Sequence, residues 1–320
     1  MGLGKSAIYT VAVGKWHVEY AQKYVDTLMR FGEYDGDVIV FTDLPNKFDS
    51  RVKTATIPNC LDPDFKNFKD ITMYKMSCGR QMYGKYQRVS YFDSDHLVLR
   101  PLKEILSFDK LTVARESCLL FENKCHFGFM TPEELAHCNR LRYPALNSGF
   151  FSAPTPEIFE EFIERWSAIC EDDSKYSPRA RYGCQDQGGF NAAIYRWGVD
   201  YKIIPQEWDV RGEDYNPVRH PHAKVIHYFG KSKKRIFREY ERIMGLDPHT
   251  SIVLNGKEKL INGNTLTYYQ ICQMAGVDDE NAVITFREAR RKGKPQKEGL
   301  IIPGEVFVCT ESVTIDVISD

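Results

Sequence analysis

The sequence predicts an α/β protein, because strands and helices alternate through its first part. A short apolar run over residues 7–13 is followed by apolar residues at helical spacing over 20–29, and a second apolar run spans 37–42. A strand, a helix and a second strand in this order form the unit from which parallel sheets are built. With 320 residues and 42% hydrophobic content, the chain is long enough for one large and one small domain.

The alternation continues up to an acidic motif. The pattern predicts a helix over 71–82 and a strand over 88–92, and Asp93-Ser94-Asp95 follows that strand directly. Ligands of open α/β sheets bind at the carboxyl ends of the strands. We therefore expect the chemistry of this protein at the acidic motif.

The rest of the first domain is predicted from shorter patterns, and its boundary is placed at residues 247–250. The predicted domains are 1–247 and 250–320. The remaining predicted elements of the first domain are strands over 147–151, 202–205 and 224–227, helices over 157–170, 190–197 and 231–242, and a glycine-rich turn over 183–189.

Charge and cysteine content narrow the class of protein. The net charge of −1 does not demand an anionic polymer as partner. Nine cysteines without paired metal-ligand spacing indicate reduced thiols, so we expect a cytoplasmic protein, or one in the host-cell cytoplasm if the source is viral. No apolar stretch reaches the roughly 18 to 20 residues of a membrane span, and the start lacks the order of a signal peptide.

The acidic motif has the composition of a metal site. Two carboxylates two residues apart, Asp93 and Asp95, can converge on one hard cation. A bound Mg²⁺ or Mn²⁺ would offset the negative charge that develops on a diphosphate leaving group. Such a pair also occurs in solvated turns, so the interpretation depends on the rest of the chain.

Other motifs accompany the acidic pair in a fixed order. They are Lys75, Asn147-Ser148-Gly149, Asp186-Gln187-Gly188 and residues 227–233, HYFGKSK. Together with residues 88–102, RVSYFDSDHLVLRPL, this series resembles the family 8 glycosyltransferases, which include glycogenin, galactinol synthase and bacterial lipopolysaccharide galactosyltransferases. The resemblance implies a Rossmann-like GT-A fold, a UDP-sugar donor, a hydroxyl acceptor and Mn²⁺ or Mg²⁺.

The resemblance also implies a role for each matching residue. His227 would join Asp93 and Asp95 as the third metal ligand, and Asp186 with Gln187 would contact the reacting sugar as the catalytic pair. Transfer with retention follows from the resemblance alone, and an inverting reaction with Asp186 as the base stays open. The donor would be bound by Tyr9, Thr10, Lys75, Ser94, Asn147, Ser148, Gly230 and Lys233. One departure is visible, because the usual Lys-Pro-Trp ending is replaced by Lys233-Lys234-Arg235.

The last seventy or so residues predict a different, α+β architecture. Strands over 251–254 and 259–261 flank Asn255-Gly256, a pair favoured in tight type I′ hairpins. Thr267 can cap a helix that ends near Ala275. Further strands are predicted over 282–286, 305–308 and 312–318. A hairpin, a helix and then more strands is the element order of a β-grasp fold.

The same segment resembles the ubiquitin-like modules of bacterial multiubiquitin cassettes. The similarity lies in the motifs NGK at 255–257, LTY at 266–268 and GLIIPG at 299–304. It implies a protein partner for residues 250–320. The chain ends without a Gly-Gly pair, which argues against conjugation through its carboxyl terminus.

The acceptor and two alternative functions stay open. The acceptor is a glycan, a protein tyrosine or a hydroxylated DNA base. DNA would be bound by the basic residues Lys231, Lys233, Lys234, Arg235, Arg238, Arg242, Arg287, Arg290, Arg291, Lys292 and Lys294. One alternative is an interaction or tagging protein with a degenerate transferase domain. The other is a nucleotidyltransferase, although residues 2–5 are too short for its phosphate loop.

Overall fold

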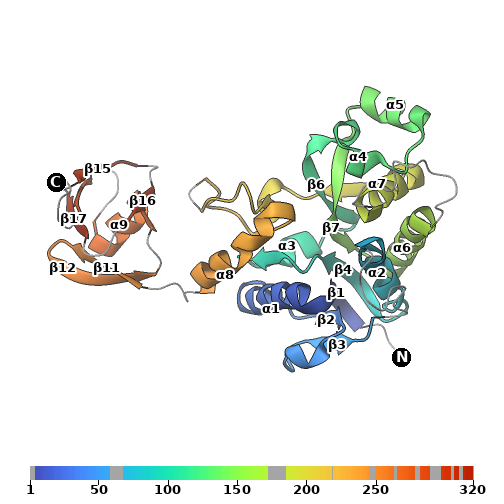
Figure 1. The fold of residues 1–320 in the computed structure, drawn as a ribbon, viewed down its shortest axis with the longest axis horizontal. Helices are drawn as coiled ribbons and strands as arrows, with labels where there is room; N and C mark the ends of the chain where they lie inside the picture. Colours follow the sequence, from blue (N-terminus) through green and yellow to red (C-terminus); the bar gives the residue numbers. More distant parts are fainter. Residues whose placement is uncertain are drawn as a thin grey trace. The chain divides into compact units, whose positions relative to one another are not determined.

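The computed structural model describes most of the chain as two compact units (Figure 1). The described residues are 4–57, 68–171, 185–217, 219–244, 249–262, 265–277, 282–288, 297–303, 306–309 and 313–319. The first unit comprises Met1–Asp214 and His222–Ile236, and the second comprises Tyr215–Pro221 and Phe237–Asp320. Of the predicted boundary at 247–250, residues 247 and 248 lie outside the described residues.

A seven-stranded mixed sheet forms the centre of the first unit and confirms the α/β class. Strand β1 runs parallel to β2 and β4, whereas β7 runs antiparallel to β4 and β6. The order across the sheet is β3 (Lys53–Ala55), β2 (Asp37–Thr42), β1 (Gly4–Ala12), β4 (Tyr86–Phe92), β7 (Pro144–Ala153), β6 (Leu111–Leu119) and β8 (Tyr201–Ile203).

Helices cover this sheet and create two hydrophobic cores. Successive residues of a strand point to opposite faces, so Tyr9 enters the core that contains residues of α2 and α6, while Ile8 enters the core that contains residues of α1. The helices are α1 (Gly14–Phe31), α2 (Phe68–Arg80), α3 (Lys103–Leu106), α4 (Lys124–Phe127), α5 (Pro132–Arg140), α6 (Pro156–Glu171) and α7 (Gln185–Trp197). Three short 3₁₀ turns lie at Pro45–Lys47, Leu120–Glu122 and Gln206–Trp208.

A smaller sheet brings distant parts of the chain together. Its order is β5 (His96–Val98), β10 (Val225–His227) and β9 (Val210–Arg211). Strands β5 and β10 are antiparallel, with His96 directly opposite His227. This pairing places His227 beside the residues that follow β4.

Two predicted local structures are wrong. Of the predicted turn over 183–189, the described residues from Gln185 onward form the start of α7. Gly189 serves close packing, because a Cβ at this position would collide with the Cys170 Sγ. The predicted helix over 231–242 is divided into a 3₁₀ turn, Gly230–Arg235, and helix α8, Ile236–Met244.

The second unit has its own five-stranded sheet and core. The order is β12 (Lys257–Asn262), β11 (His249–Leu254), β17 (Val313–Ile318), β14 (Val283–Arg287) and β15 (Glu298–Ile301). Strands β13 (Thr265–Thr267) and β16 (Val306–Val308) form a separate pair. Helix α9 (Tyr268–Ala275) packs into this core through Ile271.

Local signals in the second unit are confirmed. Asn255 and Gly256 have φ values of 47° and 72°, the left-handed conformation that a type I′ hairpin requires. The Thr267 side chain accepts a hydrogen bond of 3.1 Å from the Gln270 backbone N–H and caps α9.

We predict that Leu28→Ala lowers the free energy of unfolding of the first unit by about 2–5 kcal/mol, because Leu28 is fully buried between α1 and the sheet. Leu141 is 55% exposed, so the matched Leu141→Ala should change stability by no more than about 0.5 kcal/mol. Urea unfolding followed by tryptophan fluorescence measures both. Equal losses in the two variants would contradict the assignment of Leu28 to the core.

Candidate functional site

A cavity of about 680 Å³ lies at the carboxyl ends of β1 and β4. Strand β4 ends at Phe92, so the acidic motif opens directly into this space. Most of the residues predicted for the site line it: Lys75, Asp93, Ser94, Asp95, Asn147, Ser148, Asp186, Gln187, His227, Gly230 and Lys233. Segments separated by more than one hundred residues thus converge on one cavity.

The side chains of Tyr9 and Thr10, predicted to bind the donor, do not line the cavity. Tyr9 is fully buried in the hydrophobic core, where its hydroxyl donates a 3.0 Å hydrogen bond to the Lys75 carbonyl. Thr10 is fully buried as well. Val11 and Val13, near the end of the same strand, line the cavity instead. The position of the strand end was predicted well, but not which of its residues reach the cavity.

Lys75 connects two carboxylates at the floor of the cavity. Its ammonium lies 2.9 Å from Asp93 Oδ1 and 2.8 Å from Asp186 Oδ2. Burial alone would lower the pKa of Lys75, but Asp186 and Asp93 outweigh burial and raise it. The Tyr91 hydroxyl donates a further hydrogen bond of 2.5 Å to Asp93. Lys75 is therefore charged and fixes both acids.

Gln187 is fixed at both ends of its side-chain amide. Its oxygen accepts hydrogen bonds of 2.8 Å from the Ser148 backbone N–H and the Ser148 hydroxyl. Its nitrogen donates to the Leu146 carbonyl at 2.7 Å. These bonds attach α7 to β7. Asp186, whose Oδ2 lies 2.9 Å from the same hydroxyl, lies beside Gln187 in the first turn of the helix.

Asn147 continues this network toward a second carboxylate. Its amide donates a 2.6 Å hydrogen bond to Glu116 Oε1, and its oxygen accepts one of 2.7 Å from the Gly149 N–H. Glu116 also lies 3.4 Å from the guanidinium of Arg211. Glu116 and Arg211 line the cavity but belong to no sequence motif. Glu116 was missed because β6, which carries it, lacks a clear period.

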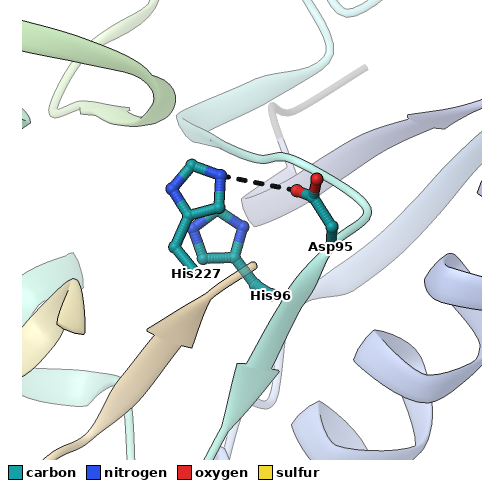
Figure 2. Close-up of side chains that lie close together, drawn as sticks. All are labelled: Asp95, His96 and His227. Atoms are coloured by element: carbon teal, nitrogen blue, oxygen red, sulfur yellow. Dashed lines mark ion pairs between the residues drawn. The ribbon is translucent and has the colours of Figure 1, made fainter. Parts of the chain in front are cut away.

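The predicted metal ligands meet at His227. The His227 Nε2 atom lies 3.4 Å from Asp95 Oδ1 and 3.8 Å from Asp93 Oδ2. Figure 2 shows the ring directed at the Asp95 carboxylate. Ligand atoms of Asp95, His96 and His227 lie within 4.8 Å of one another, so this buried group could hold a metal ion.

Buried polar atoms without hydrogen-bond partners show whether a cation fits this group. Among the described residues, Asp95 Oδ1, His96 Nε2 and both ring nitrogens of His227 are buried without a hydrogen-bond partner. Buried polar atoms without a partner are costly. A cation between Asp95 and His227 would satisfy two of them. The carboxylate suits Mn²⁺ or Mg²⁺, and the imidazole favours a transition metal over Mg²⁺.

Nearby charges control the protonation of the ligands. Burial opposes ionisation of Asp95, but Lys233 and His227 hold the pKa of this carboxyl well below its usual range. Burial lowers the pKa of the His227 imidazole, but the Asp209 and Asp95 carboxylates outweigh burial and raise it to about 10. A cation that binds Nε2 would therefore replace a proton there.

Lys233 lies at the opposite side of Asp95. Its ammonium is 2.7 Å from Asp95 Oδ2. The turn that carries it begins at Gly230, whose φ of 58° belongs to the left-handed region that favours glycine. The absence of the usual Lys-Pro-Trp ending therefore does not remove this lysine from the cavity.

The basic residues proposed for DNA binding have varied surroundings. Besides Lys233, Arg235 donates to the Glu213 carbonyl at 3.2 Å, and Arg242 donates to the Tyr215 hydroxyl at 3.1 Å. Residues 290–294 lie outside the described part of the chain. The basic residues up to Arg235 belong to the first unit, and those from Arg238 onward belong to the second unit.

Comparison with models of known protein families gives no match, and a search of curated proteins gives no significant match. The helices in the described part of the chain include none with the length and apolar character to cross a membrane.

We predict that Lys75→Met lowers the free energy of unfolding by about 3–5 kcal/mol in metal-free buffer, because Asp93 and Asp186 lose a buried cation. The matched control is Lys53→Met. Lys53 pairs with Asp37 while 63% exposed, so its loss should cost at most about 1 kcal/mol. Urea unfolding of both variants provides the measurement. If they unfold at the same midpoint, Lys75 does not balance the buried charge.

Proposed function

We propose that the first unit is a divalent-metal-dependent glycosyltransferase that moves a sugar from a nucleoside diphosphate, preferably UDP, to a hydroxyl group. One observation carries the proposal: Asp93, Asp95 and His227 meet in a large cavity, with buried donor atoms that lack partners. The cavity has room for a nucleotide and a sugar, since ligand sites commonly measure about 300–1,000 Å³.

The topology is consistent with a GT-A fold. Strands β3, β2, β1 and β4 are parallel neighbours, and β7 and β6 extend the sheet with mixed directions. The acidic motif follows β4 at the carboxyl edge of the parallel part, where ligands of α/β sheets bind. The similarity of the ordered motifs to family 8 enzymes supports the same assignment.

The proposed metal ligands and Lys233 would act on the leaving diphosphate. Asp93, Asp95 and His227 would hold Mn²⁺ or Mg²⁺, which supplies Lewis-acid stabilisation of the leaving diphosphate. Lys233 places a second positive charge beside the same position.

The sugar would lie toward the other side of the cavity. Asp186 is held by Lys75 and Ser148, so its carboxylate is fixed where it can accept hydrogen bonds from sugar hydroxyls. Gln187 has both ends of its amide bonded to the protein and positions this segment. Retention of configuration is proposed from the resemblance.

For the second unit we propose a β-grasp, ubiquitin-like module that binds a protein partner. Its first and last strands, β11 and β17, are parallel neighbours at the centre of the sheet. Helix α9 follows the first hairpin, as the β-grasp order requires. Cys78, Cys118, Cys138 and Cys309 are free thiols, which supports a reducing, cytoplasmic environment.

We predict that UDP binds the full chain at least about tenfold more tightly with Mn²⁺ than with EDTA, because Asp93, Asp95 and His227 would hold the ion and its positive charge would stabilise the diphosphate. Asp95→Asn should abolish this difference, whereas Asp49→Asn, which changes an exposed aspartate, should preserve it. Isothermal titration measures these affinities. Mn²⁺-independent UDP binding would contradict the metal assignment.

Activity is tested with a panel of nucleoside diphosphate sugars, including UDP-glucose and UDP-galactose. We expect Mn²⁺-dependent release of UDP by the wild type. The rate of this release should fall at least about a hundredfold in Asp186→Asn, because the asparagine carries no charge to balance that of Lys75. Release of UDP at the buffer rate from every donor would favour an interaction protein with a degenerate transferase unit. Formation of inorganic pyrophosphate from a nucleoside triphosphate and a sugar phosphate would indicate a nucleotidyltransferase.

A further inference from the structure

A buried carboxylate lies behind the proposed metal ligands. Asp209 follows the 3₁₀ turn Gln206–Trp208, and its side chain is 7% exposed. Its Oδ1 atom lies 3.4 Å from His227 Nδ1 and 3.6 Å from His96 Nε2. One carboxylate therefore faces two imidazoles. No sequence motif indicated this residue.

The two nitrogens of His227 face opposite partners. Nδ1 points to Asp209, while Nε2 points to Asp95 and Asp93. A neutral imidazole carries one proton and one lone pair. With the proton on Nδ1, toward Asp209, the lone pair is on Nε2 and is available to a cation. A carboxylate behind a ligating histidine commonly fixes its ring and tautomer in this way.

His96 links the same carboxylate to the acidic motif. Its ring stacks on that of His227, with centroids 4.0 Å apart and planes at 16° (Figure 2). Its Nδ1 lies 2.9 Å from the backbone carbonyl oxygen of Asp93, so this nitrogen carries a proton. Its Nε2 faces Asp209. Both nitrogens of His96 are therefore directed at protein oxygens.

We propose that Asp209 is a positioning residue for the metal site, which orients His227 Nε2 toward the cation and, through His96, holds the backbone turn at Asp93. The inference rests on the metal site of the proposed function. It assigns His96 to the support of that site, although His96 belongs to the group that could hold an ion.

Manganese binding without nucleotide tests this inference. Electron paramagnetic resonance counts free Mn²⁺ in titrations of the full chain, well below its unfolding temperature. We expect Asp209→Asn to weaken Mn²⁺ binding by about 10- to 100-fold, the range known for such supporting residues. Asp49→Asn, at an exposed position, is the matched control and should bind Mn²⁺ like the wild type.

A spectroscopic signature separates positioning from general support of the fold. In the Zn²⁺-loaded wild type, the His227 Nδ1–H proton should resonate far downfield, because a carboxylate accepts it. In Asp209→Asn this resonance should move upfield. A merely structural role would lower the unfolding midpoint of Asp209→Asn but leave the Mn²⁺ affinity of the folded protein unchanged.

The Mn²⁺ titrations distinguish a failure of the role of Asp209 from a failure of the proposed metal site. Wild-type protein that binds no Mn²⁺ would overturn the metal site, and the inference with it. Wild-type binding that Asp209→Asn retains in full would overturn the role of Asp209 alone. Mn²⁺ binding abolished in His96→Gln as completely as in His227→Ala would make His96 a ligand and overturn its supporting role.

Discussion

The balance of buried charge beneath the cavity is the constraint on which the first unit depends. Asp95, Asp186 and Asp209 are buried and Asp93 is partly buried, and isolated buried carboxylates are too costly for a folded protein. Lys75 and Lys233 supply opposing charges from two different segments. A cation between Asp95 and His227 would add positive charge where donor atoms still lack partners.

The fold places these groups through strand pairing. Because His96 lies opposite His227 in the small sheet, the imidazole reaches the acidic motif across about 130 positions of sequence. The hydrogen bonds from Ser148 to the Gln187 side chain similarly fix the first turn of α7 against β7. Asp186 lies in this turn and is fixed as well. Strand pairing and side-chain hydrogen bonds between elements thus set the spacing of the polar groups.

Sequence patterns predicted the parts that depend on local chemistry. The strand over 37–42, the Asn255-Gly256 hairpin and the cap at Thr267 follow from a continuous apolar run, left-handed turn residues and hydrogen bonding within a few residues. The convergence of Asp93, Asp95 and His227 was predicted from ordered motifs rather than from periodicity.

Features that depend on long-range packing were not predicted. Gly189 was assigned to a turn, yet it lies in helix α7, at a position where Cys170 leaves no room for a side chain. Asp209 and Glu116 carry no local signal, since their importance comes only from the histidines and amides that surround them. Tyr9 was assigned to the donor, but strand alternation directs it into the core.

The most direct measurement of the central claim is anomalous X-ray scattering from crystals of the full chain grown with Mn²⁺ and UDP. We expect a manganese peak within about 2.3 Å of carboxylate oxygens of Asp93 and Asp95 and of His227 Nε2, in contact with the diphosphate. A peak elsewhere, or UDP bound in this cavity with no manganese beside it, would show that these residues do not form the metal site.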